Sequence, residues 1–155
     1  MLSPILLLSI IIWLVFLVVS YPFIVVYELW LKYRFWWRHG KFGRFVLFVY
    51  SDSPNWKDYI EANILPRIER NAVILNWSKR GEWSKINPFE ATLFNHWAGR
   101  TEFNPMALIF SPSGKVKDVR FWSAFKEFKH GKHKSLREAE NNLFAEIEEF
   151  RSKET

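Results

Sequence analysis

Residues 45–57 read FVLFVYSDSPNWK, and this stretch decides the fold of the region around it. Its first six residues are apolar without interruption, which is typical of a strand buried on both faces of a sheet. Apolar residues then recur at helical spacing from Trp56. Asp52 or Ser53 is expected to cap this helix, with Pro54 in its first turn. A buried strand that passes directly into a helix predicts an α/β domain.

The next segments continue this alternation of strands and helices. Pro66 is expected to kink the first helix. Residues 72–77 (AVILNW) indicate a second buried strand, and residues 78–87 a polar connection. Pro88 can open a second helix that ends at Gly99. Two strands joined by a helix predict a parallel pair with a right-handed crossover.

The last part of the chain indicates a β-hairpin and a final helix. Residues 106–110 and 115–122 form the two predicted strands, with Gly114 in the turn, and a basic loop follows. Ser135 and Glu138 have the spacing of a capping box. The final helix carries an apolar stripe of Leu136, Ala139, Leu143, Ile147 and Phe150. The order βαβαββα predicts an α/β sandwich, a four-stranded mixed sheet with helices on both faces.

This order resembles the thioredoxin-like fold over residues 44–151. The apolar strand runs into a helix interrupted by Pro66, and the hairpin leads to an amphipathic last helix. Asn104 and Pro105 stand immediately before a strand, where thioredoxins place a cis-proline that faces the active site. The resemblance implies a cis bond at Pro105 and an edge there that pairs with an extended peptide.

The sequence departs from thioredoxins at the position of their Cys-x-x-Cys motif. The chain contains no cysteine and has SDSPNWK there instead. Thiol–disulfide exchange needs a thiolate, so redox activity of that kind is excluded, as are disulfides and thiolate metal sites. The chain is also similar to bacterial membrane-anchored proteins with an FNPMA segment and a later FKHGK segment, a likeness that implies no activity.

Two interpretations of the turn after the first strand stay open. Its residues could form a peptide groove with the segment before the third strand, or they could simply close the helix end and shape the loop. Ser53 lacks a recognisable base and serine-hydrolase elbow, so no catalytic residue is predicted. The candidate groove consists of Asp52, Ser53, Pro54, Asn55, Trp56, Asn104 and Pro105.

The N-terminal region predicts one transmembrane helix. Residues 5–27 contain no charged residue and are long enough to cross a hydrocarbon core of about 30 Å. The run lacks the basic start and small-residue cleavage site of a signal peptide, and a core helix is rarely apolar on all faces. We therefore divide the chain into an anchor (1–27), a basic-aromatic juxtamembrane segment (28–44) and a thioredoxin-like soluble domain (45–155).

The juxtamembrane segment predicts the orientation of the anchor. It has five Lys or Arg residues and one acidic residue, whereas no Lys or Arg precedes the apolar run. The positive-inside rule then places the N-terminus outside and the soluble domain in the cytoplasm, at a bacterial inner membrane. A plain helix extension with exposed charges is the alternative. The predicted lipid-interface residues are Trp30, Lys32, Tyr33, Arg34, Trp36, Trp37 and Arg38.

A second basic cluster lies late in the chain. Residues 114–137 hold eight Lys or Arg residues and two acidic residues. They could bind an anionic surface, namely lipid headgroups, a phosphate or RNA, or they could be a solvated charge run. His130 and His133 alone are too few ligands to predict a metal site. The candidate residues are Lys126, Lys129, His130, Lys132, His133 and Lys134.

The sequence thus leads to two expected functions. The first is a non-enzymatic interaction module, anchored in membrane lipid, whose redox-inactive thioredoxin-like domain docks a protein or peptide. The alternative is binding of an anionic ligand (lipid headgroup, nucleotide or nucleic acid) through residues 114–137. No cofactor or metal is expected, and the sequence indicates no oligomeric state.

Overall fold

The computed structural model describes residues 3–154. Its contacts divide the chain after Phe35 into an N-terminal helical unit and a larger C-terminal unit, and we describe each on its own. Helix α1 (Pro4–His39) supplies the N-terminal unit. Among the described residues, it is the one helix long and apolar enough to cross a membrane, by length and composition.

A four-stranded mixed sheet forms the centre of the C-terminal unit, as predicted. Its strands are β1 (Val46–Tyr50), β2 (Ala72–Asn76), β3 (Met106–Phe110) and β4 (Val116–Arg120). They lie in the order β2-β1-β3-β4. The pair β1–β2 is parallel, whereas β1–β3 and β3–β4 are antiparallel. All five residues of β1 and of β3 are buried, which explains their uninterrupted apolar sequences.

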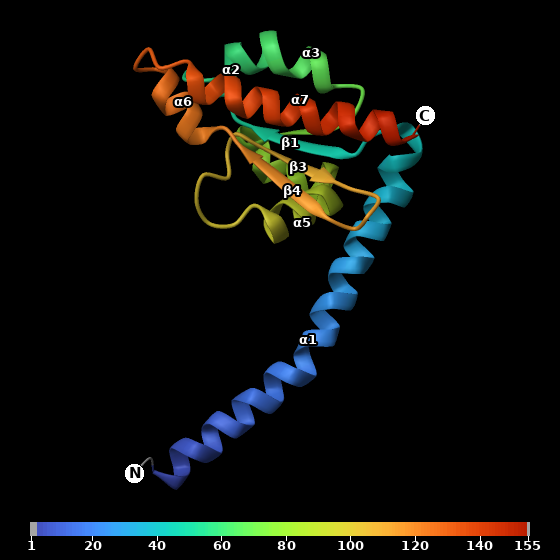
Figure 1. The fold of residues 1–155 in the computed structure, drawn as a ribbon, viewed down its shortest axis with the longest axis vertical. Helices are drawn as coiled ribbons and strands as arrows, with labels where there is room; N and C mark the ends of the chain where they lie inside the picture. Colours follow the sequence, from blue (N-terminus) through green and yellow to red (C-terminus); the bar gives the residue numbers. More distant parts are fainter. Residues whose placement is uncertain (1–2, 155) are drawn as a thin grey trace. The chain divides into compact units, whose positions relative to one another are not determined.

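Helices cover both faces of this sheet (Figure 1). On one face lie α2 (Lys57–Tyr59), a π-helical segment (Ile60–Ile64), α3 (Leu65–Ile68), α6 (Trp122–Phe128) and α7 (Lys134–Glu154). The other face carries α5 (Pro88–Trp97), which follows a 3-10 helix (Trp77–Glu82) and α4 (Trp83–Ile86). The predicted arrangement of helices on both faces is therefore confirmed.

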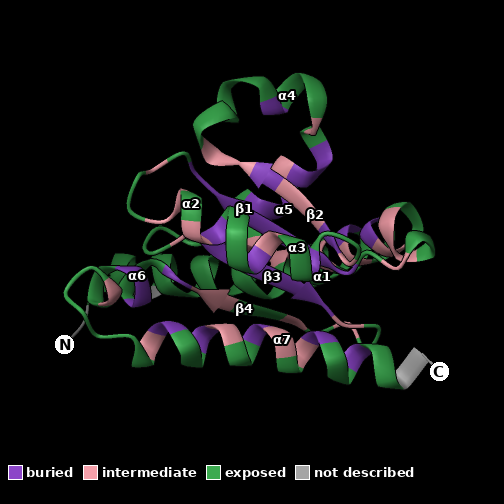
Figure 2. Cartoon of the chain, turned by 90° about the horizontal axis from the view of Figure 1, so that it is seen from above, coloured by how far each residue is buried: buried purple, intermediate pink, exposed green. Residues whose placement is uncertain are grey.

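The hydrophobic core lies between the sheet and the helices. The predicted stripe of α7, from Leu136 to Phe150, is buried in it. Figure 2 shows buried residues alternating with intermediate and exposed ones along α7, and it shows that the neighbouring strand β4 is intermediate or exposed, whereas β1 and β3 are buried. On the other face, Trp83 and Phe94 pack edge to face with ring centroids 5.6 Å apart. The amphipathic pattern of the last helix thus predicted its packing correctly.

The first helix of the domain departs from regular α geometry where proline was expected to disturb it. The backbone takes π geometry over Ile60–Ile64, and Pro66 lies in the first turn of α3. Proline has no N–H to donate and crowds the preceding turn, so a wider turn immediately before it accommodates the missing hydrogen bond.

Two local predictions were wrong, and a third was incomplete. The polar connection over residues 78–87 contains short helices that were not predicted, and within it Trp83 is buried, with its indole Nε1–H donating to the carbonyl of Asn76 at 3.1 Å. Part of the expected basic loop is helix α6. Ser135 does not cap the last helix: α7 begins at Lys134, and the Ser135 hydroxyl donates to Glu127.

Candidate functional site

Three segments meet at one edge of the sheet. The parallel strands β1 and β2 end there, with Tyr50 beside Asn76 in register. The antiparallel strand β3 begins there, with Met106 beside Val49. The turn after β1, the turn after β2 and residues 103–105 therefore lie close together. Ligand sites of α/β proteins commonly occupy this kind of edge, outside the carboxyl ends of parallel strands.

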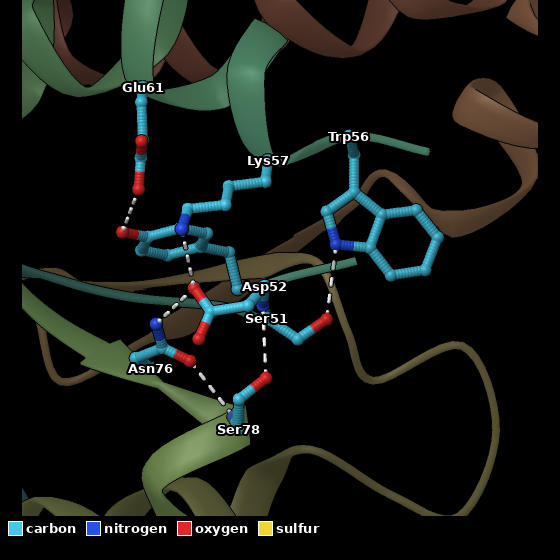
Figure 3. A network of polar contacts seen from close by, with 8 residues as sticks. Ser51, Asp52, Trp56, Lys57, Glu61, Asn76 and Ser78 are labelled. Carbon is cyan, nitrogen blue, oxygen red and sulfur yellow. Dashed lines mark hydrogen bonds and ion pairs between the residues drawn. The ribbon is translucent and has the colours of Figure 1, made fainter. Parts of the chain in front are cut away.

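Asp52 is the centre of a polar network at this edge (Figure 3). Its Oδ1 atom accepts a hydrogen bond from Asn76 Nδ2 at 2.9 Å and lies 3.2 Å from Lys57 Nζ. Its backbone N–H donates to Ser78 Oγ at 3.0 Å, and the Ser78 N–H donates to Asn76 Oδ1 at 2.9 Å. These bonds join the turn after β1 to the turn after β2.

The prediction that Asp52 or Ser53 caps the following helix was wrong. Helix α2 begins only at Lys57, and its N-cap residue, Trp56, makes no side-chain capping bond. The Asp52 carboxylate binds Asn76 and Lys57 instead. The strand pairing explains the difference, because the parallel partner β2 brings an amide donor next to the carboxylate, which local sequence does not reveal.

The network keeps Asp52 ionised. The hydrogen bond from Asn76, followed by the one from Lys57, lowers the pKa of the Asp52 carboxyl, and Asp52 in turn raises the pKa of Lys57. Burial and the hydrogen bond that Tyr50 donates to Glu61 raise the pKa of Tyr50 to about 12. A carboxylate with a lowered pKa is a poor proton acceptor near pH 7.

The other residues of the predicted groove differ in exposure. Pro54 and Asn55 are exposed, and Ser53 Oγ accepts a bond from the side-chain amide of Asn55 at 3.3 Å. Trp56 packs against the core: its ring lies 6.2 Å from that of Phe125, and its Nε1–H donates to Ser51 Oγ at 3.2 Å. The exposed tip of the turn is therefore residues 54 and 55.

The Asn104–Pro105 peptide bond is cis, as the resemblance implied. Pro105 is buried, and its carbonyl accepts a hydrogen bond from the Phe121 N–H at 2.9 Å. Asn104 is half-buried, and its Oδ1 atom has no hydrogen-bond partner among residues 3–154. Within the same residues, neither its main-chain N–H nor its carbonyl makes a main-chain hydrogen bond. Within these residues, Asn104 thus has polar side-chain and main-chain groups without partners, next to the cis bond.

The segment before Asn104 is held on both sides. The Phe103 ring lies 4.9 Å from Trp77 and 6.2 Å from Phe94, on the α5 face of the sheet. On the other side, the Ser123 hydroxyl donates to Glu102 at 3.3 Å. The two residues before Asn104 are therefore fixed, Phe103 by packing and Glu102 by a hydrogen bond.

Three of the six candidate residues of the late basic cluster, Lys126, His130 and Lys132, line a surface cavity of about 390 Å³, whereas Lys129, His133 and Lys134 do not. The ammonium group of Lys126 lies 5.4 Å from the Trp122 ring centroid. In the part of the chain that the structure describes, Lys126 and Lys132 form no ion pair, whereas Lys134 lies 3.7 Å from Glu138. The cavity is lined by Glu102, Trp122, Ser123, Lys126, Glu127, His130 and Lys132.

The two histidines of this cluster have different surroundings. His130 is exposed, and the His133 ring lies edge-on to Phe128 at 4.8 Å. Among residues 3–154, no three His, Asp or Glu side chains lie close enough together to hold a metal ion.

The structure separates the predicted lipid-interface residues into two groups. Trp36 was predicted at the lipid interface, but its ring stacks on Phe150 at 5.6 Å and packs against the domain core, so that assignment is corrected. Arg38 lies 3.1 Å from buried Glu90. Trp37 is 68% exposed. In the N-terminal unit, Trp30, Tyr33 and Arg34 are exposed, and Lys32 lies 3.8 Å from Glu28.

Sequence reasoning missed several residues that the structure places in these polar contacts, among them Lys57, Asn76, Ser78 and Glu90. For Asn76 and Ser78 a signal existed, because they follow the second predicted strand and parallel strands end at the same edge. No comparable signal pointed to Glu90, which lies on α5 and meets a residue 51 positions earlier.

No protein-family model matches this chain, and no curated protein or solved structure matches it either. What the site does must therefore be argued from its own geometry.

Proposed function

We propose that this protein is a non-enzymatic docking module anchored in a membrane by α1. Its C-terminal unit acts as a thioredoxin-like domain without thiols and binds an extended segment of a protein partner. The N-terminus lies outside, and the domain lies in the cytoplasm of a bacterium. The apolar anchor, the basic residues that follow it and the absence of cysteine support this proposal.

The observation that carries the proposal is the placement of Asn104. Its main-chain N–H and carbonyl, which make no main-chain hydrogen bond within residues 3–154, stand at the open end of the β1–β3 ladder, next to the turn that follows β1. Unpaired main-chain groups beside a sheet are what an added peptide strand needs in β-augmentation. Two features support the thioredoxin-like interpretation. The strand order is β2-β1-β3-β4, and the helical segment after β1 packs on the same face of the sheet as α7.

The polar network of Asp52 favours docking over catalysis. The carboxylate is already bound to Asn76 and Lys57, and Ser53 bonds only to Asn55 among the side chains of the described residues. A nucleophilic serine needs a base within hydrogen-bond reach. In this proposal the turn forms one side of the peptide site, and exposed Pro54 and Asn55 contact the peptide.

Site-specific photocrosslinking tests the docking proposal. A benzophenone amino acid at position 55 of the full chain, expressed in its native membranes, is expected to give a defined adduct with a polypeptide. The same group at Asn95, exposed on α5, is the matched control. Asn104→Arg should block the groove and abolish the adduct at position 55. Persistence of the adduct in Asn104→Arg, or equal adducts at positions 55 and 95, would contradict the proposal.

The orientation can be tested with single cysteines because the chain has none of its own. In intact cells, a membrane-impermeant maleimide should label Ser3→Cys but not Ser113→Cys, which lies in the exposed hairpin turn. Permeabilised cells should label both. Labelling of Ser113→Cys in intact cells would reverse the assigned topology.

A second candidate function is binding of an anionic ligand at the cavity beside Trp122. Among the residues that the structure describes, Lys126 and Lys132 form no ion pair, whereas the two acidic residues of the cavity accept hydrogen bonds from serine hydroxyls. The full chain in neutral nanodiscs should bind a fluorescent single-stranded oligonucleotide or an inositol phosphate in low salt. The double variant Lys126→Glu/Lys132→Glu should weaken binding at least tenfold, and Lys79→Glu/Lys85→Glu should not. Equal binding by all variants would refute this candidate.

A further inference from the structure

Two aromatic rings stand out into solvent where the C-terminal unit begins. Trp37 is 68% exposed and Phe42 is 66% exposed. The ammonium group of Lys41 lies close to both rings, 5.5 Å from the Trp37 ring centroid and 5.1 Å from that of Phe42. Cations at such distances from aromatic faces are attracted by the ring quadrupole. The positive charge of Lys41 thus lies next to two exposed aromatic rings.

The backbone that carries these residues is fixed from several sides. The Gly43 N–H donates to the carbonyl of Gly40 at 2.8 Å, and Asn71 Nδ2 donates to the carbonyl of Gly43 at 3.0 Å. His39 Nε2 lies 2.7 Å from Glu90 Oε1. These contacts fix the turn to the domain, so the backbone that carries Trp37 and Phe42 is already ordered. Ligand binding there therefore costs little additional conformational entropy.

The adjacent residues Trp36 and Trp37 differ in their surroundings. The Trp36 ring stacks on Phe150, whose own ring stacks on Phe45 at 4.1 Å. Gly40 makes room for this packing, since a Cβ atom there would lie 2.2 Å from the Trp36 ring. Of two adjacent tryptophans, one therefore secures the turn to the core and the next one faces outward.

The chemistry of the patch fits a phospholipid headgroup better than a protein surface. A stable protein interface involves about 20–30 residues on each side, whereas this patch is a pair of rings and one ammonium group. Tryptophan favours the headgroup layer, and a lysine near the surface adds roughly 1 kcal/mol of attraction to anionic lipid.

We propose that Trp37, Lys41 and Phe42 form an interfacial site for the phosphate of an anionic phospholipid, with both rings inserted at headgroup depth. This inference rests on the anchoring of α1 in a membrane, as given under the proposed function, but not on peptide docking. The site holds the C-terminal unit against anionic membrane.

Spin labels on single cysteines test the site in the full chain, reconstituted in nanodiscs. A label at Arg44→Cys keeps Trp37, Lys41 and Phe42 intact, and the oxygen-to-nickel collision ratio reports its depth. We expect headgroup depth in phosphatidylcholine/phosphatidylserine discs and a shift toward water in pure phosphatidylcholine. Lys41→Glu should cause the same shift and lower the relative association of spin-labelled phosphatidylserine about fivefold. Lys85→Glu is the matched control.

Two further labels separate the possible failures. A label at Val15→Cys should report hydrocarbon in every disc, and one at Asn95→Cys should report water. A water-like Arg44→Cys label in phosphatidylserine discs, together with a hydrocarbon-like Val15→Cys label, would overturn the lipid site but leave the anchor intact. A water-like Val15→Cys label would overturn the anchor itself. Dipolar broadening between Arg44→Cys labels in both lipids would show that a second copy covers the patch instead.

Discussion

The imidazole Nε2 of His39 lies 2.7 Å from the carboxylate Oε1 of Glu90, a residue 51 positions later in the chain. Arg38 Nε lies 3.1 Å from the same oxygen, and Glu90 is 1% exposed. The contact fastens the end of α1 to the first turn of α5 within the C-terminal unit. A buried carboxylate is stable only with such partners, so this pair should matter for the stability of the unit.

Glu90→Gln is expected to destabilise the C-terminal unit by about 1–3 kcal/mol, because the amide accepts weaker hydrogen bonds from His39 and Arg38 than the carboxylate does. Chemical denaturation of the full chain in nanodiscs, followed by far-UV circular dichroism, measures the loss. Glu82→Gln, at an exposed acidic position before α4, should change little. A loss below about 0.5 kcal/mol would show that the pair contributes no net stability.

The same carboxylate should make stability depend on acid pH. Burial alone would raise the pKa of Glu90, but the hydrogen bond from His39, a backbone hydrogen bond and the charge of Arg38 outweigh burial and lower it below its ordinary value of 4.5. A lowered folded-state pKa gives stability that is present above the unfolded pKa and lost as pH falls through the folded one. Between pH 6 and 3, the wild-type chain should lose stability more steeply than Glu90→Gln; parallel profiles would contradict this.

Gly40→Ala is expected to loosen the turn before β1. The new Cβ atom would lie 2.2 Å from the Trp36 ring and force that ring away from Phe150. Overpacking of this kind typically costs about 1–3 kcal/mol. Gly81→Ala is the matched control, because a Cβ at Gly81 meets nothing within 4 Å. Thermal melts of both variants should therefore differ, and equal melting temperatures would mean that Trp36 moves without cost.

Asn76→Ala should break the connection between the turns after β1 and β2. The change removes the donor to Asp52 and the acceptor of the Ser78 N–H, and each lost bond is worth about 0.5–1.5 kcal/mol. The pKa of Asp52 should rise back toward 3.8, since the bond from Asn76 is its largest cause of lowering. Carboxyl chemical shifts followed by NMR measure this pKa. Asn141→Ala, on the exposed face of α7, should leave the pKa unchanged.

Much of the fold could be predicted from periodicity because its main elements are strongly patterned. The two apolar runs at 46–50 and 106–110 became fully buried strands, and the stripe from Leu136 to Phe150 became the buried face of α7. Short elements such as α4 and α6 were missed, because one or two turns of helix carry too little periodicity to detect. The cap at Asp52 was misassigned, because local preference was overridden by a partner from β2.

By itself, the sequence determined the long apolar segment, the α/β class and the absence of thiol chemistry, since each follows from composition or from a repeat along the chain. Only the tertiary structure decided which polar groups meet. It placed Asn76 beside Asp52, Glu90 beside His39, and Trp36 inward while Trp37 faces outward. Hydrophobic patterning acts through neighbours in sequence, whereas hydrogen bonds and ion pairs depend on positions that only strand pairing and helix packing bring within 3 Å of each other.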